Sequence, residues 1–370
     1  MPVAISMQNI LIAKDKKVIL FDREGKTIQE FKVPEPVVNV YINDHSSDPR
    51  SQRLFYLVTE RGRLYTFGDS QNGLLGVEET GPYINEPQLV DKKIGIVKQI
   101  KFAPYHIVLL NNKGEMYGAG INVFDQLGFE FFEALSFEKF NLEQFGPVKQ
   151  IACGYRSTLA LTENNQLIEW GADSGTKPRL INLPNNTDAI LTILSNRYTN
   201  YIVTKNHVYI PSKGNRTIYQ PLDFLSFKGI INITASSDFC IAQSKEENFF
   251  GWGHLPFEQW NTEAKYALPI NAKAMHCFKS GLLMLTQDYE VRFIQKEQEK
   301  EPHECVLPEG IKTSLEQVVF NDYFKSKEQV RNNLYSSLNK RNYTDLFFTH
   351  AENTVFSDES ISLDNPFTSL

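Results

Sequence analysis

The sequence has little cysteine, no long apolar run and no excess of positive charge. Its 370 residues include four cysteines with no CxxC pair and no metal-ligand spacing: Cys153, Cys240, Cys277 and Cys305. We therefore expect no metal site. The first three lie in or beside apolar strand-like segments, where reduced and buried thiols are usual. This favours a reducing compartment.

Two further absences limit the function. No stretch approaches 18 consecutive apolar residues, and Met1–Lys17 lacks the apolar core of a signal peptide. We therefore expect no membrane span. We also expect the protein to be cytoplasmic and monomeric. The formal net charge is −6, so no basic field exists to attract a phosphate backbone, and we expect no direct nucleic-acid binding.

Motifs of catalysis are also missing. The chain has no GxSxG, HExxH or calcium-loop pattern, and the runs Gly118–Gly120 and Gly251–Gly253 are too short for a phosphate loop. The seven histidines are scattered. We therefore expect no covalent catalytic site and no cofactor.

What the chain does contain is a repeat, seen most clearly in Val148–Gly171. The segment reads as strands over Val148–Cys153, Thr158–Leu161 and Leu167–Trp170, separated by turns containing Gly or Asn and closed by Gly171. Alternation with period two between such turns is typical of antiparallel strands. A unit this short cannot bury its own apolar face, so it needs neighbours.

The same pattern begins at six positions along the chain. The starts are Val37, Val97, Val148, Ile190, Ile230 and Ala272, giving spacings of 60, 51, 42, 40 and 42 residues. Further short apolar segments between the units supply a fourth strand for each. A period of about 42 with four strands per unit is typical of a β-propeller blade.

The two ends of the chain suggest how the ring closes. Ile10–Ala13, Val18–Phe21 and Ile28–Val33 read as the last three strands of a unit without its first, and Leu315–Phe320 reads as a first strand alone. Pairing them would remove both exposed sheet edges. The sequence therefore predicts an all-β, closed seven-bladed propeller over residues 1–320. Residues 321–370 would form an amphipathic helix at Tyr323–Lys340 and a polar tail.

The repeat resembles that of the RCC1 (regulator of chromosome condensation) family. Besides strand order and period, Gly120–Gly128, GINVFDQLG, is similar to the family's GxNxxGQLG turn, with Asn122, Gln126, Leu127 and Gly128 as matches. The resemblance implies a seven-bladed propeller. It also departs from the family pattern: the histidine after the first turn is present only as His106, and the glycine-rich turn is missing after the later repeats. The chain therefore resembles a diverged member.

A protein-binding face is predicted from chain direction. In an up-and-down blade, the turns after strands one and three share one end, and loops on a rigid scaffold commonly carry binding residues. Tyrosine and arginine there are typical of protein interfaces, although such residues also simply cap hairpins and face water. The candidates in the first turns are Tyr105, His106, Tyr155, Arg156, Arg197, Tyr198, Asp238 and Phe239.

The longest insertion on that face is rich in phenylalanine. Phe124–Phe145 carries seven phenylalanines among acidic residues. One interpretation is an outer strand followed by a short packed helix. The other is a protruding element that docks a protein partner, with Phe129, Phe131, Phe132 and Glu133 as contacts.

The family resemblance implies a partner class, because an RCC1-type propeller acts on the small GTPase Ran. We therefore predict a propeller that binds a small GTPase, of Ran or Rab/Rho type, and promotes nucleotide exchange. The alternative is a non-catalytic scaffold, for example in a ubiquitin pathway. The acidic, serine-containing tail also resembles those of bacterial effectors that enter host cells, which would place the protein in the host cytosol.

Overall fold

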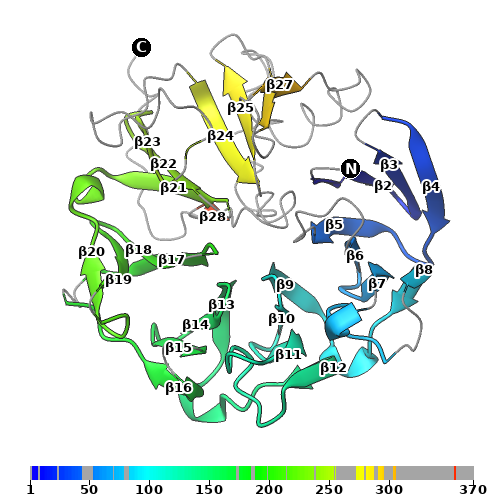
Figure 1. Cartoon of the computed structure of the whole chain (residues 1–370), viewed down its shortest axis with the longest axis horizontal. Coiled ribbons are helices and arrows are strands. Elements are labelled where there is room, and N and C mark those ends of the chain that lie inside the picture. Colours follow the sequence, from blue (N-terminus) through cyan, green and yellow to red (C-terminus); the bar gives the residue numbers. More distant parts are fainter. Residues whose placement is uncertain are drawn as a thin grey trace.

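The computed structural model describes most of residues 2–253 and, beyond them, 255, 272–278, 281–286, 291–295, 303–305 and 354–355. The gaps within residues 2–253 are 7–8, 23–24, 44–52, 70, 79–82, 172–174, 185–187, 198, 214 and 237–238. The described strands pair into seven four-stranded sheets, all antiparallel. Figure 1 shows these sheets placed around a common centre, which is the arrangement of a β-propeller.

The first four sheets follow one another along the chain. The first contains β1 (Val3–Ile5), β2 (Asn9–Lys14), β3 (Lys17–Asp22) and β4 (Thr27–Lys32). The second contains β5 (Val37–Asn43), β6 (Leu54–Thr59), β7 (Leu64–Asp69) and β8 (Tyr83–Leu89). The third contains β9 (Val97–Phe102), β10 (His106–Asn111), β11 (Met116–Ile121) and β12 (Glu133–Lys139). The fourth contains β13 (Val148–Cys153), β14 (Ser157–Thr162), β15 (Leu167–Gly171) and β16 (Gly175–Leu180).

Three more sheets follow. The fifth contains β17 (Ile190–Ser195), β18 (Asn200–Thr204), β19 (Val208–Pro211) and β20 (Tyr219–Pro221). The sixth contains β21 (Ile230–Ala235), β22 (Phe239–Ser244) and β23 (Phe249–Gly253), with β28 (Thr354–Val355) paired to β21. The seventh contains β24 (Ala272–Phe278), β25 (Gly281–Thr286), β26 (Val291–Gln295) and β27 (His303–Cys305). Short 3-10 turns are η1 (Gln71–Gly73), η2 (Lys92–Ile94), η3 (Glu143–Phe145) and η4 (Asp223–Leu225).

The predicted repeat starts are confirmed, because the strands β5, β9, β13, β17, β21 and β24 begin at the six expected residues. The amino-terminal sheet differs from the prediction. Its first strand is β1, which pairs with β2, with Ala4 opposite Leu11. The amino-terminal residues therefore occupy the place beside β2 that was predicted for Leu315–Phe320. Leu315–Phe320 and the helix expected at Tyr323–Lys340 lie outside the described residues.

Steric contacts explain why a glycine ends the third strand in each of the first three full repeats. Gly68, Gly120 and Gly171 have φ of 116°, 107° and 120°. A Cβ on Gly120 or Gly171 would strike the carbonyl oxygen of Tyr105 or Arg156 in the preceding turn. After Gly120, the carbonyl oxygen of Tyr105 accepts a hydrogen bond from Ile121 N at 2.7 Å, and after Gly68 that of Arg53 accepts one from Asp69 N at 2.9 Å. Only glycine permits both this approach and this φ.

Neighbouring sheets are joined by apolar contacts and by a repeated glutamine. Gln99 on β9 donates to Lys149 O at 3.4 Å and accepts from Ile151 N at 3.2 Å on β13. Gln150 on β13 makes the equivalent pair with Leu191 O and Ile193 N, both at 3.3 Å. Apolar side chains also pack between successive sheets. Trp170 on β15 of the fourth sheet contacts Phe140, which follows β12 of the third sheet, with ring centroids 5.2 Å apart.

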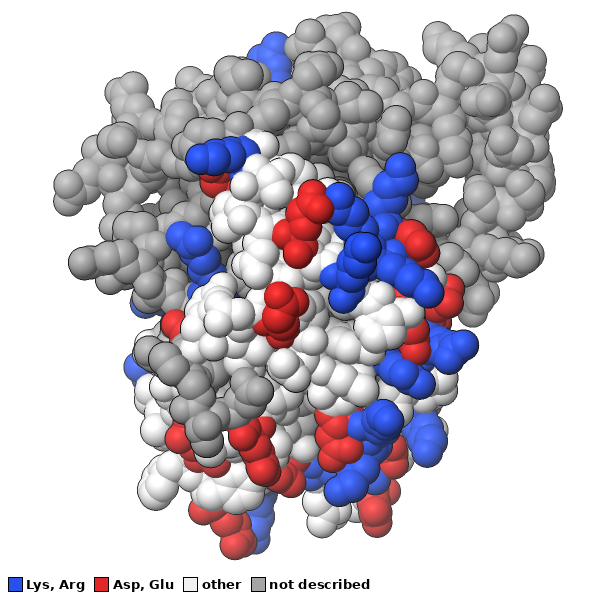
Figure 2. All heavy atoms as spheres, turned by 90° about the vertical axis from the view of Figure 1, so that its right-hand side faces the viewer, with Lys and Arg blue, Asp and Glu red and all other residues white. Residues whose placement is uncertain are grey.

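The side of the molecule over the amino-terminal sheets carries both signs of charge. Figure 2 shows a group of Lys and Arg side chains with Asp and Glu directly beside it. Among the described residues, Lys17 pairs with Glu30 at 2.8 Å and Arg63 with the nearly buried Glu35 at 3.0 Å. Basic residues on this side are therefore partly neutralised by acidic neighbours.

Candidate functional site

The turns after the first strands of neighbouring sheets meet on one face, here called the first-turn face. Tyr105 lies between β9 and β10, and Tyr155 lies at the equivalent place between β13 and β14. Their hydroxyls are 3.1 Å apart, and their rings meet edge to face with centroids 5.1 Å apart. Phe124, from the loop after β11, is 6.2 Å from both rings. Three aromatic rings from two sheets therefore form one group.

Two arginines complete this group. The Arg156 guanidinium carbon lies 4.4 Å from the Phe124 ring centroid and 5.4 Å from that of Tyr155. Arg197, in the turn between β17 and β18, lies 5.4 Å from the same Tyr155 ring. Both arginines are exposed. We call the following five residues the aromatic–arginine cluster: Tyr105, Phe124, Tyr155, Arg156 and Arg197.

The side chains of the cluster carry positive charge. The hydrogen bond with Tyr155, together with burial, raises the pKa of the Tyr105 hydroxyl, and the charges of Arg197 and Arg156 partly offset this rise. The phenol is therefore neutral near pH 7, whereas both guanidinium groups stay charged. The cluster therefore places two cations against the rings of Phe124 and Tyr155 at the first-turn face.

His106 does not belong to this surface, although the sequence predicted it as a contact for a partner. It is 0% exposed, and its Nε2 lies 2.9 Å from Thr158 Oγ1. The Thr158 hydroxyl donates its proton to Gln126 O at 2.6 Å, so Nε2–H of His106 is the donor to Thr158. Burial lowers the pKa of His106 to about 3. The histidine is a neutral link between two neighbouring sheets.

The remaining first-turn candidates divide into two groups. Phe239 begins β22 and is 3% exposed, so its side chain belongs to the core and cannot contact a partner from this position. Tyr198 and Asp238 lie outside the described residues. Phe124 was predicted only as the first residue of the phenylalanine-rich insertion and not as a contact of the first turns. Its place in the turn after a third strand, beside a first turn, is the signal that could have found it.

The phenylalanine-rich insertion combines the two alternatives. Its later part forms the outer strand β12 and the short turn η3, as the first interpretation predicted. The loop before β12 is held by Asn122, which is 2% exposed. Its amide donates to Phe129 O and Phe131 O, both at 2.9 Å, and its Oδ1 accepts from Leu127 N at 2.7 Å. Asn122 and Gln126 are therefore structural residues of this loop.

The tip of the same loop exposes two aromatic side chains. Phe129 stacks on Phe131 with centroids 5.0 Å apart and also contacts Phe140. Phe131 is 44% exposed and Phe132 is 80% exposed, and Glu133 beside them is exposed. Because the loop connects the end of β11 to the start of β12, it lies on the first-turn face. This face therefore carries the cluster and a fixed apolar loop.

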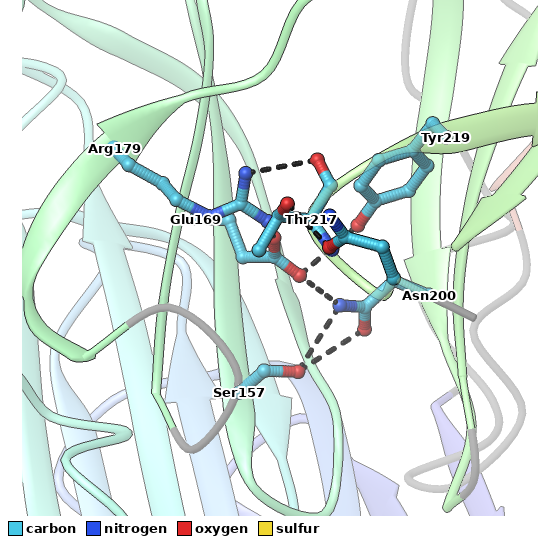
Figure 3. Close-up of polar contacts among 7 residues, drawn as sticks. Ser157, Glu169, Arg179, Asn200, Thr217 and Tyr219 are labelled. Atoms are coloured by element: carbon cyan, nitrogen blue, oxygen red, sulfur yellow. Dashed lines mark hydrogen bonds and ion pairs between the residues drawn. The ribbon is translucent and has the colours of Figure 1, made fainter. Parts of the chain in front are cut away.

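A second polar cluster is buried between the fourth and fifth sheets (Figure 3). Glu169 on β15 is 3% exposed and forms an ion pair with Arg179 on β16. The same carboxylate accepts from Asn200 Nδ2 at 2.7 Å and from the Tyr219 hydroxyl at 3.0 Å. Burial, followed by the Glu169 charge, raises the pKa of Tyr219 well above its usual value. The hydroxyl stays protonated, and the network joins the two sheets.

The described part of the chain holds no group of three or more His, Cys, Asp or Glu side chains suited to a metal ion. None of its helices is long and apolar enough to cross a membrane.

Comparison with known proteins identifies relatives of this architecture, although no family model matches the chain. The chain is 32% identical over 124 residues to the ultraviolet-B receptor UVR8 of Arabidopsis thaliana, covering 31% of the chain and 26% of that protein. It is 29% identical over 113 residues to the bovine secretion-regulating guanine nucleotide exchange factor, covering 30% and 24%. It is 24% identical over 237 residues to an RCC1 repeat-containing protein of Dictyostelium discoideum, covering 52% and 47%. The matches thus span under half of these proteins' lengths.

Solved structures show the same fold at low identity. Human WBSCR16 superposes with a TM-score of 0.60 at 15% identity, covering 76% of this chain and 85% of that one. Prp20p of Saccharomyces cerevisiae superposes with a TM-score of 0.52 at 17% identity, covering 68% and 71%. These similarities, together with those in sequence, confirm the resemblance to RCC1-repeat propellers.

Proposed function

Because this chain is a diverged relative of the RCC1-repeat proteins, we propose that it is a closed seven-bladed propeller that binds a small GTPase and promotes release of its nucleotide. The propeller would span residues 1–320, with residues 321–370 as a carboxyl-terminal extension, from which Thr354–Val355 pairs with β21 of the sixth sheet. Closure is supported by the placement of seven four-stranded sheets around one centre. A closed ring would protect the edges that an open array of sheets exposes.

The observation that carries the binding proposal is the first-turn face. It joins the aromatic–arginine cluster to a loop that is held by buried hydrogen bonds and exposes Phe131 and Phe132. Aromatic residues and arginine are enriched at protein interfaces, and exposed aromatic anchors commonly dominate their binding energy. A fixed loop also loses little conformational entropy on binding.

The exchange activity is proposed from the relatives. One of them is named as a guanine nucleotide exchange factor, and Prp20p is described as binding Gsp1p and histones. Exchange needs no acid, base or metal from this chain. It needs tighter binding to the nucleotide-free partner than to the loaded one, because a ligand shifts an equilibrium only by its differential affinity. Phe131, Phe132 and Glu133 would be the inserted groups.

The test is the release of fluorescent mant-GDP from Ran and from a panel of Rab and Rho GTPases. We expect this chain to accelerate release from at least one of them. The double variant Phe131→Ser/Phe132→Ser should abolish most of the acceleration. Substitution at the loop tip is preferred to deletion, because a deletion reaching β12 would remove an outer strand. No acceleration with any GTPase would refute the proposed exchange activity.

Phe227 offers a matched control. It is 74% exposed, close to the 80% of Phe132, but it lies between β20 and β21, at the opposite end of the blades. Phe227→Ser should leave the acceleration unchanged. If Phe227→Ser and the loop-tip variant slow exchange equally, the first-turn face is not the GTPase-binding site.

A scaffold without exchange activity is the second candidate. It is favoured by the unlike activities of the relatives, which include a light receptor and an exchange factor on related repeats. Affinity capture in the presence of GDP, GTP or neither distinguishes the two. A partner held equally well in all three conditions supports the scaffold, and a GTPase retained best without nucleotide supports exchange.

A further inference from the structure

We infer that the aromatic–arginine cluster binds an acidic peptide segment of a protein partner, with Arg156 and Arg197 contacting two of its carboxylates. The inference concerns the partner's chemistry at the first-turn face. It rests on the proposed function only in treating that face as the protein-binding one, and it does not depend on whether the partner is a GTPase.

The first step is the geometry of the two guanidinium groups. Arg156 and Arg197 each lie 5.4 Å from the Tyr155 ring centroid, so their guanidinium carbons are no more than about 11 Å apart. Contact with a ring uses the flat face of a guanidinium group, whereas its N–H donors lie in the plane of the group. A face-on contact of Arg156 with Phe124 would therefore leave its in-plane donors directed away from the ring.

The aromatic rings that contact the two guanidinium groups are held in place by contacts between neighbouring turns. The Tyr105 and Tyr155 hydroxyls lie 3.1 Å apart and join turns from neighbouring sheets. The Arg156 guanidinium carbon contacts two of these rings, at 4.4 Å from the Phe124 centroid and 5.4 Å from the Tyr155 centroid. The cluster is therefore organised before any partner binds, which lowers the entropic cost of holding a long arginine side chain in place.

The third step is charge. The five cluster residues include two cations and no carboxylate, and none of the ion pairs found among the described residues involves Arg156. By contrast, the exposed Arg61 at the opposite end of the blades lies 3.8 Å from the Glu35 carboxylate. Arg156 is thus a positive charge outside these ion pairs in a protein of net charge −6, and complementarity favours an anionic partner.

The fourth step is spacing. In an extended peptide, side chains two residues apart lie on the same face and are separated by roughly 6.5 to 7 Å. Two acidic residues separated by one other residue therefore fit within the upper limit of about 11 Å between the two guanidinium carbons. A planar guanidinium group can donate two hydrogen bonds to one carboxylate, so two guanidinium groups favour a segment with two carboxylates.

The test uses the full-length chain and a fluorescein-labelled 12-residue peptide containing Asp-x-Asp, with binding followed by fluorescence anisotropy. We expect saturable binding that weakens with added salt, and loss of binding when both aspartates are replaced by asparagine. Arg156→Gln and Arg197→Gln should each weaken binding about tenfold or more, since a charge-assisted hydrogen bond is lost. A GTPase is absent from this assay, so its result is independent of the exchange measurement.

Controls separate this site from general attraction of charge. Arg61→Gln removes an exposed arginine from the opposite end of the blades, with its side chain 69% exposed, and should leave affinity unchanged. Arg156→Lys keeps the charge without the planar fork and should still weaken binding several-fold. Equal loss in Arg61→Gln and Arg156→Gln, full affinity in Arg156→Lys, or preference for a phosphoserine peptide over the Asp-x-Asp peptide would each overturn the inference.

Discussion

Two arginines of the fourth sheet lie in contrasting environments, one against a buried carboxylate and one exposed on aromatic rings. Arg179 on β16 is paired with the buried Glu169, whose other oxygen accepts hydrogen bonds from the fifth sheet. Arg156, in the turn between β13 and β14, is exposed and lies over aromatic rings. Both arginines join neighbouring sheets. Only the first is tied to a buried charge, so only its loss would leave one uncompensated.

The largest effect should come from the buried network. Glu169→Ala removes the partner of Arg179 and leaves the Asn200 amide and the Tyr219 hydroxyl without their acceptor. We expect the free energy of unfolding to fall by about 3 kcal/mol, which is within the range for breaking a buried ion pair. Urea denaturation followed by fluorescence measures this. A loss under about 1 kcal/mol would mean that the network adds little to the joint between the two sheets.

The next effect should come from the glycine that lies under the turn of Arg156. Gly171→Ala places a Cβ against Arg156 O at a φ of 120°, so we expect a loss of about 2 to 3 kcal/mol and a displaced turn. Gly95→Ala is the matched variant, because Gly95 has a φ of 80° but no atom nearer than 3.8 Å to the added Cβ. It should cost only about 1 kcal/mol. Equal losses in the two variants would assign the effect to φ alone.

A third effect concerns pH. The unfolded chain binds a proton at His106 near pH 6.5, whereas burial keeps its native pKa at about 3. Its contribution to stability is therefore full above pH 6.5 and is lost as the pH falls toward 3. At pH 5 the loss should be about 2 kcal/mol relative to neutral pH. His106→Gln should flatten the dependence of unfolding free energy on pH between 5 and 7, and an unchanged slope would contradict this assignment.

The smallest effect should come from Arg156 itself. Arg156→Gln removes an exposed cation and its contact with Phe124, so the free energy of unfolding should change by no more than about 1 kcal/mol. The measurement is the same urea titration as for Glu169→Ala. The contrast between the two variants is the sharpest test of the comparison, and a loss from Arg156→Gln as large as that from Glu169→Ala would make the cluster a structural joint.

The fold was largely predictable because its signals are local and repeated. Period-two alternation and turn residues located all six first strands at their observed starts, including Val148 of β13. The amino-terminal strand β1 was missed because Val3–Ile5 is only three residues long, too short to show alternation. A longer apolar segment, Leu315–Phe320, therefore looked like the better candidate for the same place.

The candidate site was predictable only in part. Counting turns placed Tyr105, Tyr155, Arg156 and Arg197 at one end of the blades, but it could not separate exposed from buried side chains in those turns. His106 and Phe239 follow the turns directly and begin strands, so their side chains enter the core. Turn position alone does not specify this, because one residue of shift reverses the direction of a side chain.

By itself, the sequence determined the repeat, the strand order and the residues at each turn, since these depend on alternation, glycine and turn chemistry over a few neighbouring positions. Only the tertiary structure decided which turns meet. Phe124 and Arg156 are 32 residues apart and belong to different sheets, yet they stack because neighbouring sheets bring their turns to one face. Contacts between repeats depend on how the sheets pack, and no local pattern encodes that geometry.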